Sequence, residues 1–315
     1  MKSFFALPKV VAFGGGHGLY ASLSALRQVT DQLTAVVTVA DDGGSSGRLR
    51  SEFEILPPGD LRMALAALCG EDLIGRQWAA VLQSRFPGDG ELGGHAIGNL
   101  LIAGVWLAIG DTVSGLDLVA KLLDTQGRVL PMSLQSLVIE ADVLGLSEVN
   151  PDEPEILRGQ AEIALTKGDV QKVRLFPENP VACPDAVRAV READYLVLGP
   201  GSWFTSVIPH LLVPELASAI VETNAKRILN LNVTPAAETQ GFTAARHLEV
   251  LAEHAPELRL DYVIADASFA VNDPHLAAFA ASLGAELIVR DVVAHDGTAR
   301  HDALRLASVL RELLV

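Results

Sequence analysis

Short apolar runs recur along the chain, with helical segments between them. Each run ends at or near Gly, Asp or Asn, as a buried strand does where the chain leaves a sheet. Near-continuous apolar strands that alternate with helices predict an α/β protein with a mostly parallel sheet covered on both faces. The runs are KVVAFGG from Lys9, TAVVTVA from Thr34, DYLVLGP from Asp194, RILNLNV from Arg227, DYVIADA from Asp261 and AELIVRDV from Ala285.

Two stretches interrupt this alternation. Residues 60–126 read as consecutive helices without a strong strand, which predicts a helical insert. Residues 128–176 predict a small β-rich segment, in which LVIEADVL, ILRGQAEIAL and VQKVRLF are separated by turn residues. The chain has no internal repeat or long linker, so we expect one elaborated α/β domain over residues 1–315. A last helix from about Asp302 is expected to pack on the sheet.

The chain is acidic, because its 315 residues carry a formal net charge of -15 at pH 7. This balance disfavours a nucleic-acid partner, since phosphate backbones require basic surfaces. The same charge is also what keeps an ordinary protein in solution. An anionic ligand must therefore be held locally, by backbone N–H groups and a few arginines.

Other features predict a cytoplasmic protein without a membrane span. Cys69 and Cys183 are the only cysteines and form no CxxC pair, which favours free thiols in a reducing compartment. Pro8 and Lys9 interrupt the apolar N-terminal run, so a first strand fits better than a signal peptide. The longest apolar stretch, residues 96–110, is shorter than the roughly 18 residues that a spanning helix needs.

The first apolar run leads into GGGHGLYASLSAL, a glycine-rich turn that opens a helix. Phosphate is the expected ligand, because glycines let the backbone approach a ligand and the N–H groups at a helix start carry partial positive charge. Gly16, Gly18 and Ala21 also satisfy the G-x-G-x-x-G/A dinucleotide pattern. The alternative is a tight structural turn without a ligand. No GK[ST] follows, which disfavours a Walker-type nucleoside triphosphatase.

The second run ends in the acidic, glycine-rich segment DDGGSSGRLR. Asp41 and Asp42 could bind ribose hydroxyls or a hard divalent cation such as Mg2+, which prefers carboxylate oxygens. If the protein is an enzyme, these two aspartates are its candidate catalytic residues. Ser45 and Ser46 add hydroxyl groups, and Arg48 adds a guanidinium for phosphate. We expect this loop to lie beside the first one. The alternative is a helix start that Asp or Ser merely caps.

Two later helix starts add polar candidates. Asp60 follows Gly59 in LPPGDLR, and Arg62 in the first turn of that helix is expected to face the same crevice. His95 and Asn99 stand at the start of the apolar helix in GGHAIGNLL. Asn99 is either a satisfied core amide or a ligand contact. His95 alone does not indicate a metal site, because no other His or Cys stands at ligand spacing.

A third small-residue loop, GPGSWFTS, follows the strand run from Asp194. Pro200 and Gly201 leave the backbone accessible, and three hydroxyl side chains stand at the following helix start. These are Ser202, Thr205 and Ser206. No G-x-S-x-G elbow surrounds the serine, which disfavours nucleophilic hydrolysis.

The next strand run leads into NVTPAAETQGF, which contributes Asn232, Glu238 and Thr239. Glu238 has two interpretations, since it could be a base or metal ligand, or a solvated loop carboxylate.

These stretches together resemble the gluconeogenesis-factor (YvcK-type) family, within the 2-phospho-L-lactate transferase-like (CofD-like) superfamily. The resemblance extends from Gly14 to about Ala307, and ADDGGSSGRLR with GPGSWFTS is its most specific part. His17 departs from the pattern, because many members carry Thr there. The other matching stretches are GGGHGL, LPPGDLR, GHAIGNLL, GRVLP, PENP, ETQGFTAARHL and RHDALRLA.

The resemblance implies a Rossmann-like, three-layer α/β/α, doubly wound fold that binds a nucleotide-containing ligand between the glycine loops. It also implies roles in cell shape, that is morphogenesis, and in growth on gluconeogenic carbon sources, with UDP-sugars such as UDP-N-acetylglucosamine as ligands. Transferase members move a phospholactyl group from a guanosine-linked diphosphate to a deazaflavin with Mg2+, but the deazaflavin pocket is not identified in this sequence.

The resemblance and the loop patterns together define one set of candidate ligand-binding residues, all at predicted strand ends or helix starts. The set is Gly14, Gly15, Gly16, His17, Gly18, Leu19, Asp41, Asp42, Gly43, Gly44, Ser45, Ser46, Arg48, Asp60, Arg62, His95, Asn99, Pro200, Gly201, Ser202, Thr205, Ser206, Asn232 and Thr239.

Three functional hypotheses follow. The main one is a cytoplasmic nucleotide-sugar-binding factor, since no convincing acid/base pair is present; it would act on a protein target in cell-wall or carbon metabolism. The alternative is a Mg2+-dependent phosphotransferase-like enzyme that acts on a nucleotide diphosphate. An NAD(P)-dependent oxidoreductase rests only on the G-x-G-x-x-A pattern, and no redox cofactor is expected. We also expect a homo-oligomer with contacts through the helical insert.

Overall fold

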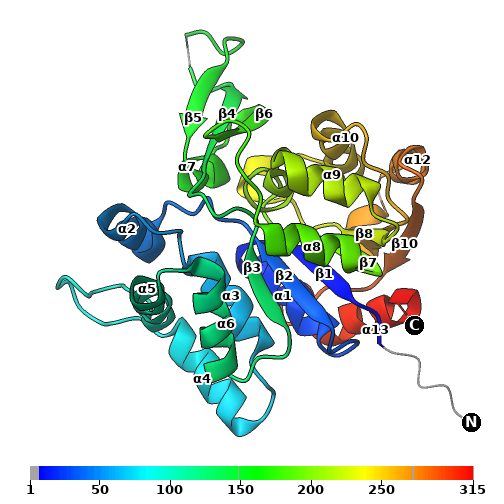
Figure 1. Ribbon diagram of the computed structural model, residues 1–315. Helices are drawn as coiled ribbons and strands as arrows, with labels where there is room; N and C mark the ends of the chain where they lie inside the picture. Colours follow the sequence, from blue (N-terminus) through cyan, green and yellow to red (C-terminus); the bar gives the residue numbers. More distant parts are fainter. Residues whose placement is uncertain (1–6, 148, 272, 315) are drawn as a thin grey trace, which may run out of the picture.

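A computed structural model describes residues 7–147, 149–271 and 273–314 and contains a large and a small sheet (Figure 1). The large sheet has seven strands in the order β10-β9-β8-β7-β1-β2-β3, and all neighbouring strands run parallel. Its strands are β1 (Val10–Gly14), β2 (Leu33–Val37), β3 (Arg128–Pro131), β7 (Tyr195–Leu198), β8 (Lys226–Asn230), β9 (Tyr262–Asp266) and β10 (Glu286–Arg290).

All the apolar runs predicted as strands lie in this sheet. They are suited to it because a parallel sheet covered on both faces buries consecutive side chains. In β1, for example, Val10, Val11, Ala12 and Phe13 are all buried. The edge strand β3 comes from the segment predicted as β-rich, and it pairs with β2 through buried Val129 and Leu130.

Helices cover both faces of the sheet, which confirms the predicted three-layer, doubly wound fold. α1, α3 and α13 pack together, whereas α8 packs with α9 and α10 with α12 (Figure 1). The longer helices are α1 (Gly16–Leu26), α2 (Gly44–Phe53), α3 (Gly59–Leu68), α4 (Leu73–Gln83), α5 (Ile97–Ile109), α6 (Thr112–Leu122), α8 (Pro184–Glu192), α9 (Pro214–Glu222), α10 (Ala244–His254), α12 (Leu276–Ser282) and α13 (Ala303–Leu314). The shorter ones are α7 (Gln160–Leu165), α11 (Ala267–Ala270), η1 (Trp203–Val207), η2 (Ile208–Leu212) and η3 (Ala237–Thr239).

The predicted run of consecutive helices at residues 60–126 is present, but its members have different positions. α3 is entirely buried and packs on α1, β2 and β3, so it belongs to the layer that covers the sheet. α4 packs on α3, α5 on α4 and α3, and α6 on α5, and α6 also packs against the edge strand β3 (Figure 1). The last helix, α13, packs mainly on α1 rather than directly on the sheet.

The small sheet is antiparallel, in the order β5-β4-β6, and projects with α7 from one end of the main body (Figure 1). We call β4 (Val138–Leu144), β5 (Glu155–Arg158), α7 and β6 (Asp169–Phe176) the arm. The prediction that ILRGQAEIAL is β-structure was wrong in its second half. The strand stops at Gly159, whose φ of +111° favours glycine. The good helix formers of QAEIAL then form α7, with Ile163 buried.

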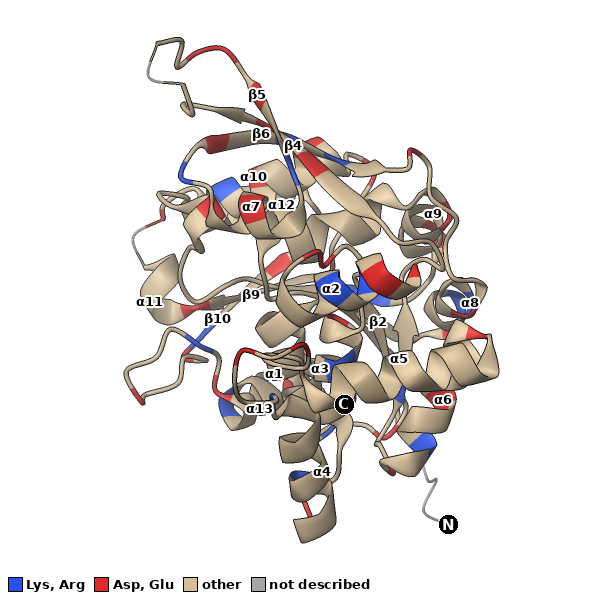
Figure 2. Cartoon of the chain, turned by 90° about the vertical axis from the view of Figure 1, so that its left-hand side faces the viewer, with Lys and Arg blue, Asp and Glu red and all other residues tan. Residues whose placement is uncertain are grey.

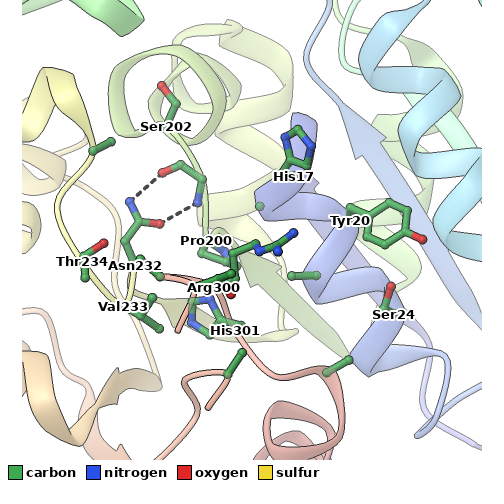
Figure 3. Close-up of a pocket in the computed structure, with 18 of the residues that line it drawn as sticks. His17, Tyr20, Ser24, Pro200, Ser202, Asn232, Val233, Thr234, Arg300 and His301 are labelled. Carbon is green, nitrogen blue, oxygen red and sulfur yellow. Dashed lines mark hydrogen bonds between the residues drawn. The ribbon is translucent and has the colours of Figure 1, made fainter. Parts of the chain in front are cut away.

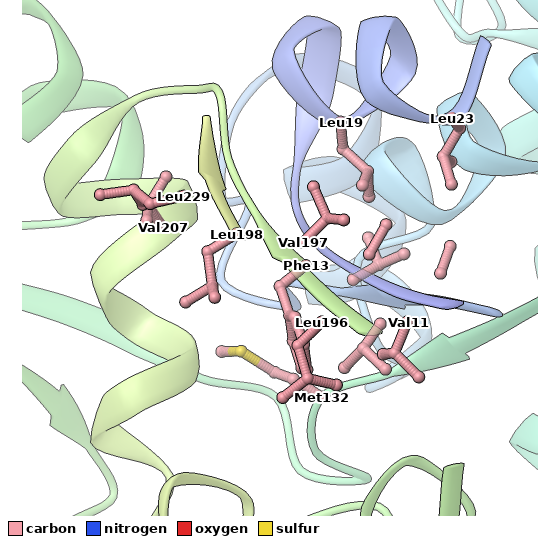
Figure 4. Close-up of a cluster of buried hydrophobic side chains, with 14 of the residues drawn as sticks. Val11, Phe13, Leu19, Leu23, Met132, Leu196, Val197, Leu198, Val207 and Leu229 are labelled. Atoms are coloured by element: carbon pink, nitrogen blue, oxygen red, sulfur yellow. The ribbon is translucent and has the colours of Figure 1, made fainter. Parts of the chain in front are cut away.

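The central core lies between β1, β7 and the helices beside them (Figure 4). Phe13, Leu19, Leu196 and Leu198 are at most 1% exposed, so the strands that carry the first and third loops are fixed from below. None of the described helices is long and apolar enough to cross a bilayer alone. The bent pair at residues 203–212 and 214–222 would qualify by length and composition only.

Candidate functional site

The strand order places the first and third loops at the point where the winding of the sheet reverses. From β1 the sheet proceeds through β2 and β3 on one side, and through β7, β8, β9 and β10 on the other. The carboxyl ends of the adjacent strands β1 and β7 therefore open into a crevice, which is where ligands bind in such sheets. The second loop follows β2, which pairs with β1, as the sequence predicted.

The first and third loops touch each other through main chain. A Cβ on Gly18 would overlap the carbonyl oxygen of Pro200 and lie 2.5 Å from the Cα of Gly201, so only glycine allows this approach. Asn232, after β8, fixes the third loop. It accepts from the Gly201 N–H at 2.9 Å and donates its amide to the Gly201 carbonyl, also at 2.9 Å (Figure 3).

A cavity of about 590 Å³ opens at this point, and we call it the switch-point cavity. The size lies within the range of small-molecule sites. α1 forms one wall and the loops after β7 and β8 form another. Lining residues between Ala294 and Ala303, from the loop after β10 to the start of α13, face α1 (Figure 3). Of the predicted residues, those that line it are His17, Gly18, Pro200, Gly201, Ser202 and Asn232.

The charge in this cavity comes from a segment that the motif analysis did not assign to the site. Arg300 is the only Lys or Arg among the lining residues that the structure describes, and its side chain extends toward α1 (Figure 3). The neighbouring His301 is neutral near pH 7, since burial lowers its pKa to about 4. Arg300 and His301 are the first two residues of the matched stretch RHDALRLA, so that stretch was the signal in the sequence that could have assigned them to the site.

Predicted residues around the second loop and the helices α2, α3 and α5 form a second group, the buried network. Ser45 Oγ lies 3.0 Å from His95 Nδ1 and accepts from Asn99 Nδ2 at 3.0 Å. Asn99 also donates to Ser46 Oγ at 3.4 Å. The contacts tie the start of α2 to the start of α5. The network further includes Asp41 and Asp60.

Asp60 is the most strongly perturbed member of the buried network. Its carboxylate accepts a hydrogen bond from the Gly16 backbone, and its Oδ2 would overlap a Cβ on Gly15, so it lies beneath the first loop. Burial, and next the nearby Asp41 carboxylate, raise the pKa of Asp60 to about 7. Within the described residues, three buried oxygens of this region have no hydrogen-bond partner: Asp60 Oδ2, Thr38 Oγ1 and Asn99 Oδ1.

These groups fit a divalent cation, and Asp60 adds a carboxylate to Asp41 and Asp42, the possible metal ligands predicted from sequence. The described residues contain no cluster of three or more His, Cys, Asp or Glu side chains placed to hold a metal. Mg2+ does not require one, because it commonly uses one or two carboxylates together with ligand phosphates. Asp41 and Asp60 offer such a pair, and the unpartnered Oδ2 of Asp60 is an available ligand.

Three predicted charged residues have other partners. Asp42 turns toward the arm, where its Oδ1 accepts from the Ala161 N–H at 3.1 Å. Arg48 donates to the carbonyl of Gly93 at 2.8 Å, on the loop before α5. Arg62 was expected to face the crevice, but it points to the end of α4, where it hydrogen-bonds to Gln83.

The hydroxyl groups of the third loop are held by a buried carboxylate. Ser202 Oγ donates to Glu238 Oε1 at 2.6 Å and also contacts Thr205 Oγ1, while the Phe204 N–H donates to the same Oε1 at 3.3 Å. Glu238 is only 3% exposed, so its interpretation as a solvated loop carboxylate was wrong. Burial raises its pKa, against the hydrogen bonds from Ser202 and the η1 backbone, which lower it.

The remaining predicted residues contribute main chain or local structure. Gly14 ends β1, and Leu19 points into the core, so only its backbone belongs to the first loop. Gly43 and Gly44 start α2, with the Gly43 N–H donating to Asp41 at 3.0 Å. Buried Ser206 lies in η1, and Thr239 Oγ1 accepts from the Ala236 N–H at 2.9 Å.

Charges elsewhere do not create a broad basic surface. On the face drawn in Figure 2, Lys and Arg are scattered among Asp and Glu over the helices and the arm. The first turn of α1 contains no acidic residue, although the Asp60 carboxylate accepts from the Gly16 backbone beneath the helix start. In the switch-point cavity the other N–H groups at this helix start and Arg300 favour an anion, whereas the lining residue Asp296 opposes one.

Known proteins share this sequence and fold over nearly their whole length. Residues 10–308 match the family described as 2-phospho-L-lactate transferase CofD. A relative from Mycobacterium tuberculosis (strain ATCC 25618 / H37Rv) is 54% identical over 305 residues, which cover 96% of this chain and 89% of the relative. The gluconeogenesis factor of Listeria innocua is 35% identical over 319 residues, covering 98% and 96%.

The solved structures agree with the sequence matches. A crystal structure of a UPF0052-family protein from Bacillus halodurans superposes with a TM-score of 0.84 at 33% identity, covering 97% of this chain and 99% of that one. The matched residues include both the switch-point cavity and the buried network. This chain therefore belongs to the CofD-like family and, within it, to the gluconeogenesis factors.

Proposed function

We propose that this protein binds a nucleotide sugar, such as UDP-N-acetylglucosamine, in the switch-point cavity. The proposal rests on one observation: glycine main chain of the first and third loops and the Arg300 guanidinium line the same cavity. Gly18 and Gly201 are in close contact at the start of α1, and Arg300 extends toward the same helix (Figure 3). A diphosphate at this place would receive N–H donors from α1 and a charged partner from Arg300.

The cavity supports a ligand larger than phosphate alone. It continues from His17 along α1 to Ser24, and its volume of about 590 Å³ suits a nucleotide. The protein's net charge of -15 repels anions at a distance, so binding depends on these local contacts. We therefore expect modest affinity that decreases with added salt.

The proposal includes Mg2+ beside the ligand. Asp41 and Asp60 would hold the ion, since their carboxylates interact electrostatically and Asp60 lies beneath the first loop. When bound, the ion would neutralise charge on a diphosphate. Main-chain N–H groups of α1 and Arg300 orient the same diphosphate from the other side.

For the biological role, we propose a cytoplasmic regulator that links carbon supply to cell-wall synthesis and cell shape. The name gluconeogenesis factor, carried by relatives, supports the carbon-supply part. Within the described residues, Ser202 donates to the buried Glu238 and is not paired with a His, which supports binding rather than hydrolysis. A protein target and a homo-oligomer with contacts through α4, α5 and α6 belong to the same proposal.

Isothermal titration calorimetry tests the binding step. The protein is titrated with UDP-N-acetylglucosamine in Mg2+ and in EDTA, with N-acetylglucosamine as the control that lacks phosphate. We expect heat with the nucleotide sugar, tighter binding in Mg2+, and no heat with the free sugar. If folded protein gives no heat with millimolar nucleotide sugar in either buffer, the proposal is wrong.

A transferase is the second candidate, favoured by the family match and by carboxylates beside the diphosphate position. Phosphoryl-group chemistry needs mainly positioning and charge stabilisation, which Arg300 and the α1 amides could supply. Phosphorus-31 NMR of the protein with a nucleotide diphosphate ligand, Mg2+ and candidate acceptor alcohols would show release of free nucleotide. An unchanged spectrum over many hours would rule against transfer to those acceptors.

A further inference from the structure

The switch-point cavity has a distinct far end, away from the start of α1. His17, Tyr20, Ala21 and Ser24 all line it. Their spacing of three, four and seven residues places them on one face of the helix. Seven residues at about 1.5 Å each span about 10 Å, so Ser24 lies well beyond any phosphate bound at the N-terminus.

The far end is faced by the segment between β10 and α13, which presents small and polar side chains to α1. The lining residues of this segment are Ala294, Asp296, Thr298, Ala299, Arg300, His301 and Ala303. Tyr20 is the only Phe, Tyr or Trp among the described lining residues, and its ring and the Ser24 hydroxyl lie on the same side of α1 (Figure 3).

We infer that this end of the cavity is a nucleobase subsite, in which the ring of Tyr20 stacks on the base and Ser24 contacts its edge. The inference rests on the proposed function, because it assumes that the diphosphate lies at the start of α1. A base presents two flat faces to apolar walls and needs hydrogen bonds only at its edge. A hexose has no aromatic face on which the Tyr20 ring could stack.

The orientation of the whole ligand follows from this placement. With the base beside Tyr20 and the diphosphate at Gly18 and Arg300, the sugar of a nucleotide sugar must lie beyond the phosphates, away from the far end. Tyr20 and Ser24 on α1 would then give the protein its specificity for nucleotides over simple sugar phosphates, because only a nucleotide carries a base that reaches the subsite.

Two ligands separate the contribution of the base from that of the phosphates. Calorimetry compares UDP, which has base and diphosphate, with inorganic pyrophosphate, which has no base. Tyr20→Ala removes one base–aromatic stack, so we expect its affinity for UDP to be about 5- to 150-fold lower than that of the wild type. Pyrophosphate affinity should change by less than about 2-fold, and Tyr20→Phe should bind UDP almost as the wild type does.

Controls address folding and the alternative orientation. Tyr262→Ala removes a tyrosine at the start of β9, at the opposite end of the strands, and should bind UDP normally. In saturation-transfer NMR with UDP-N-acetylglucosamine, base protons should receive more saturation than hexose protons. The inference is overturned if Tyr20→Ala weakens both ligands equally, or if the hexose receives the greater saturation. Failure of wild type to bind any nucleotide would instead reject the proposed function and this subsite with it.

Discussion

The switch-point cavity and the buried network lie at the same edge of the sheet, yet they are built from opposite chemistry. The cavity is open and combines main chain and small side chains with Tyr20, Asp296 and Arg300. The network is largely buried, although Ser45 and His95 also line a second pocket beside Arg48, and it contains Asp60, a buried carboxylate with an unpartnered oxygen, near Asp41. The sequence motifs grouped residues of both into one set, but the structure separates them into a half with main-chain amides and a guanidinium, which suit an anion, and a half with carboxylates, which suit a cation.

Under the proposed function, this difference explains how an acidic protein would hold a diphosphate. The two halves share the first loop, because Gly18 faces Pro200 and Gly201 while Gly15 and Gly16 lie against Asp60. A cation on the carboxylate side and amides on the other would act on the same phosphate groups. Each half should therefore respond differently to pH, salt and Mg2+.

The largest expected effect comes from Asp60→Asn in metal-free protein. The folded-state pKa of Asp60, about 7, lies above its ordinary value of 3.8, so folded protein binds more protons than unfolded protein between these values. The wild-type free energy of unfolding should accordingly fall as pH rises from about 4 to 7, by up to about 4 kcal/mol. Asp60→Asn should remove this decrease and be more stable at pH 8.

Urea unfolding in EDTA from pH 4 to 8 measures this effect. Asp89→Asn on an exposed loop serves as the control and should keep the wild-type slope. Added Mg2+ should stabilise wild type at pH 8 but not Asp60→Asn, since the variant lacks one carboxylate of the pair. Equal slopes in all three proteins would show that Asp60 does not titrate as the structure indicates.

Gly18→Ala should have the next largest effect, and on the open half alone. The added Cβ would overlap backbone atoms of Pro200 and Gly201, which cannot yield as a flexible side chain can. Strain of about 1–3 kcal/mol would separate the two loops and weaken nucleotide binding by up to about 100-fold.

Gly104→Ala in α5 is the matched control for Gly18→Ala. Its Cβ would meet nothing within 4 Å, so we expect unchanged binding and a gain of about 1 kcal/mol in helix stability. Calorimetry with UDP-N-acetylglucosamine and thermal unfolding compare the two variants. Wild-type affinity in Gly18→Ala would mean that contact between the first and third loops is not needed for the site.

The sequence was sufficient to predict the sheet and the meeting of its loops. The strands are buried on both faces, so their apolar runs are visible without tertiary information, and parallel strands bring their carboxyl ends to one edge. The sequence analysis placed β3 in the β-rich segment rather than in the large sheet, because its few residues resemble the β-rich stretch that follows them. ILRGQAEIAL was misread because apolar residues in a short window do not distinguish strand from helix.

Side-chain direction was not predictable in the same way. Asp42, Arg48 and Arg62 stand in motifs that suggest ligand contacts, but their partners are Ala161, Gly93 and Gln83, all distant in sequence. Motif spacing fixes where the backbone turns, and not which neighbouring element a long side chain reaches. Arg300 shows the opposite case, because the motif analysis did not assign it to the site. It lies on a loop without a periodic pattern, and only the fold brings it to the cavity.

Arg300→Gln tests the charge of the open half. A hydrogen bond to a charged group contributes about 1.5–3 kcal/mol, so the nucleotide affinity should fall by roughly 10- to 100-fold. The salt dependence of binding should also become weaker, because the variant lacks the only cation lining the cavity among the described residues. Calorimetry at low and high salt measures both, with Arg290→Gln on β10 as the control.

Asp42→Asn should have the smallest effect on ligand binding. The variant therefore distinguishes the role of Asp42 from that of its neighbour Asp41. Its carboxylate accepts from the Ala161 N–H in α7, so its loss weakens the attachment of the arm by about 1 kcal/mol rather than the ligand site. Hydrogen exchange should accelerate in α7 and β5, while nucleotide affinity stays within about 3-fold of wild type. Asp152→Asn, exposed within the arm, should alter neither measurement. If Asp42→Asn instead abolished the Mg2+ dependence of binding, the cation would belong with the adjacent aspartates, and the pairing of Asp41 with Asp60 would be wrong.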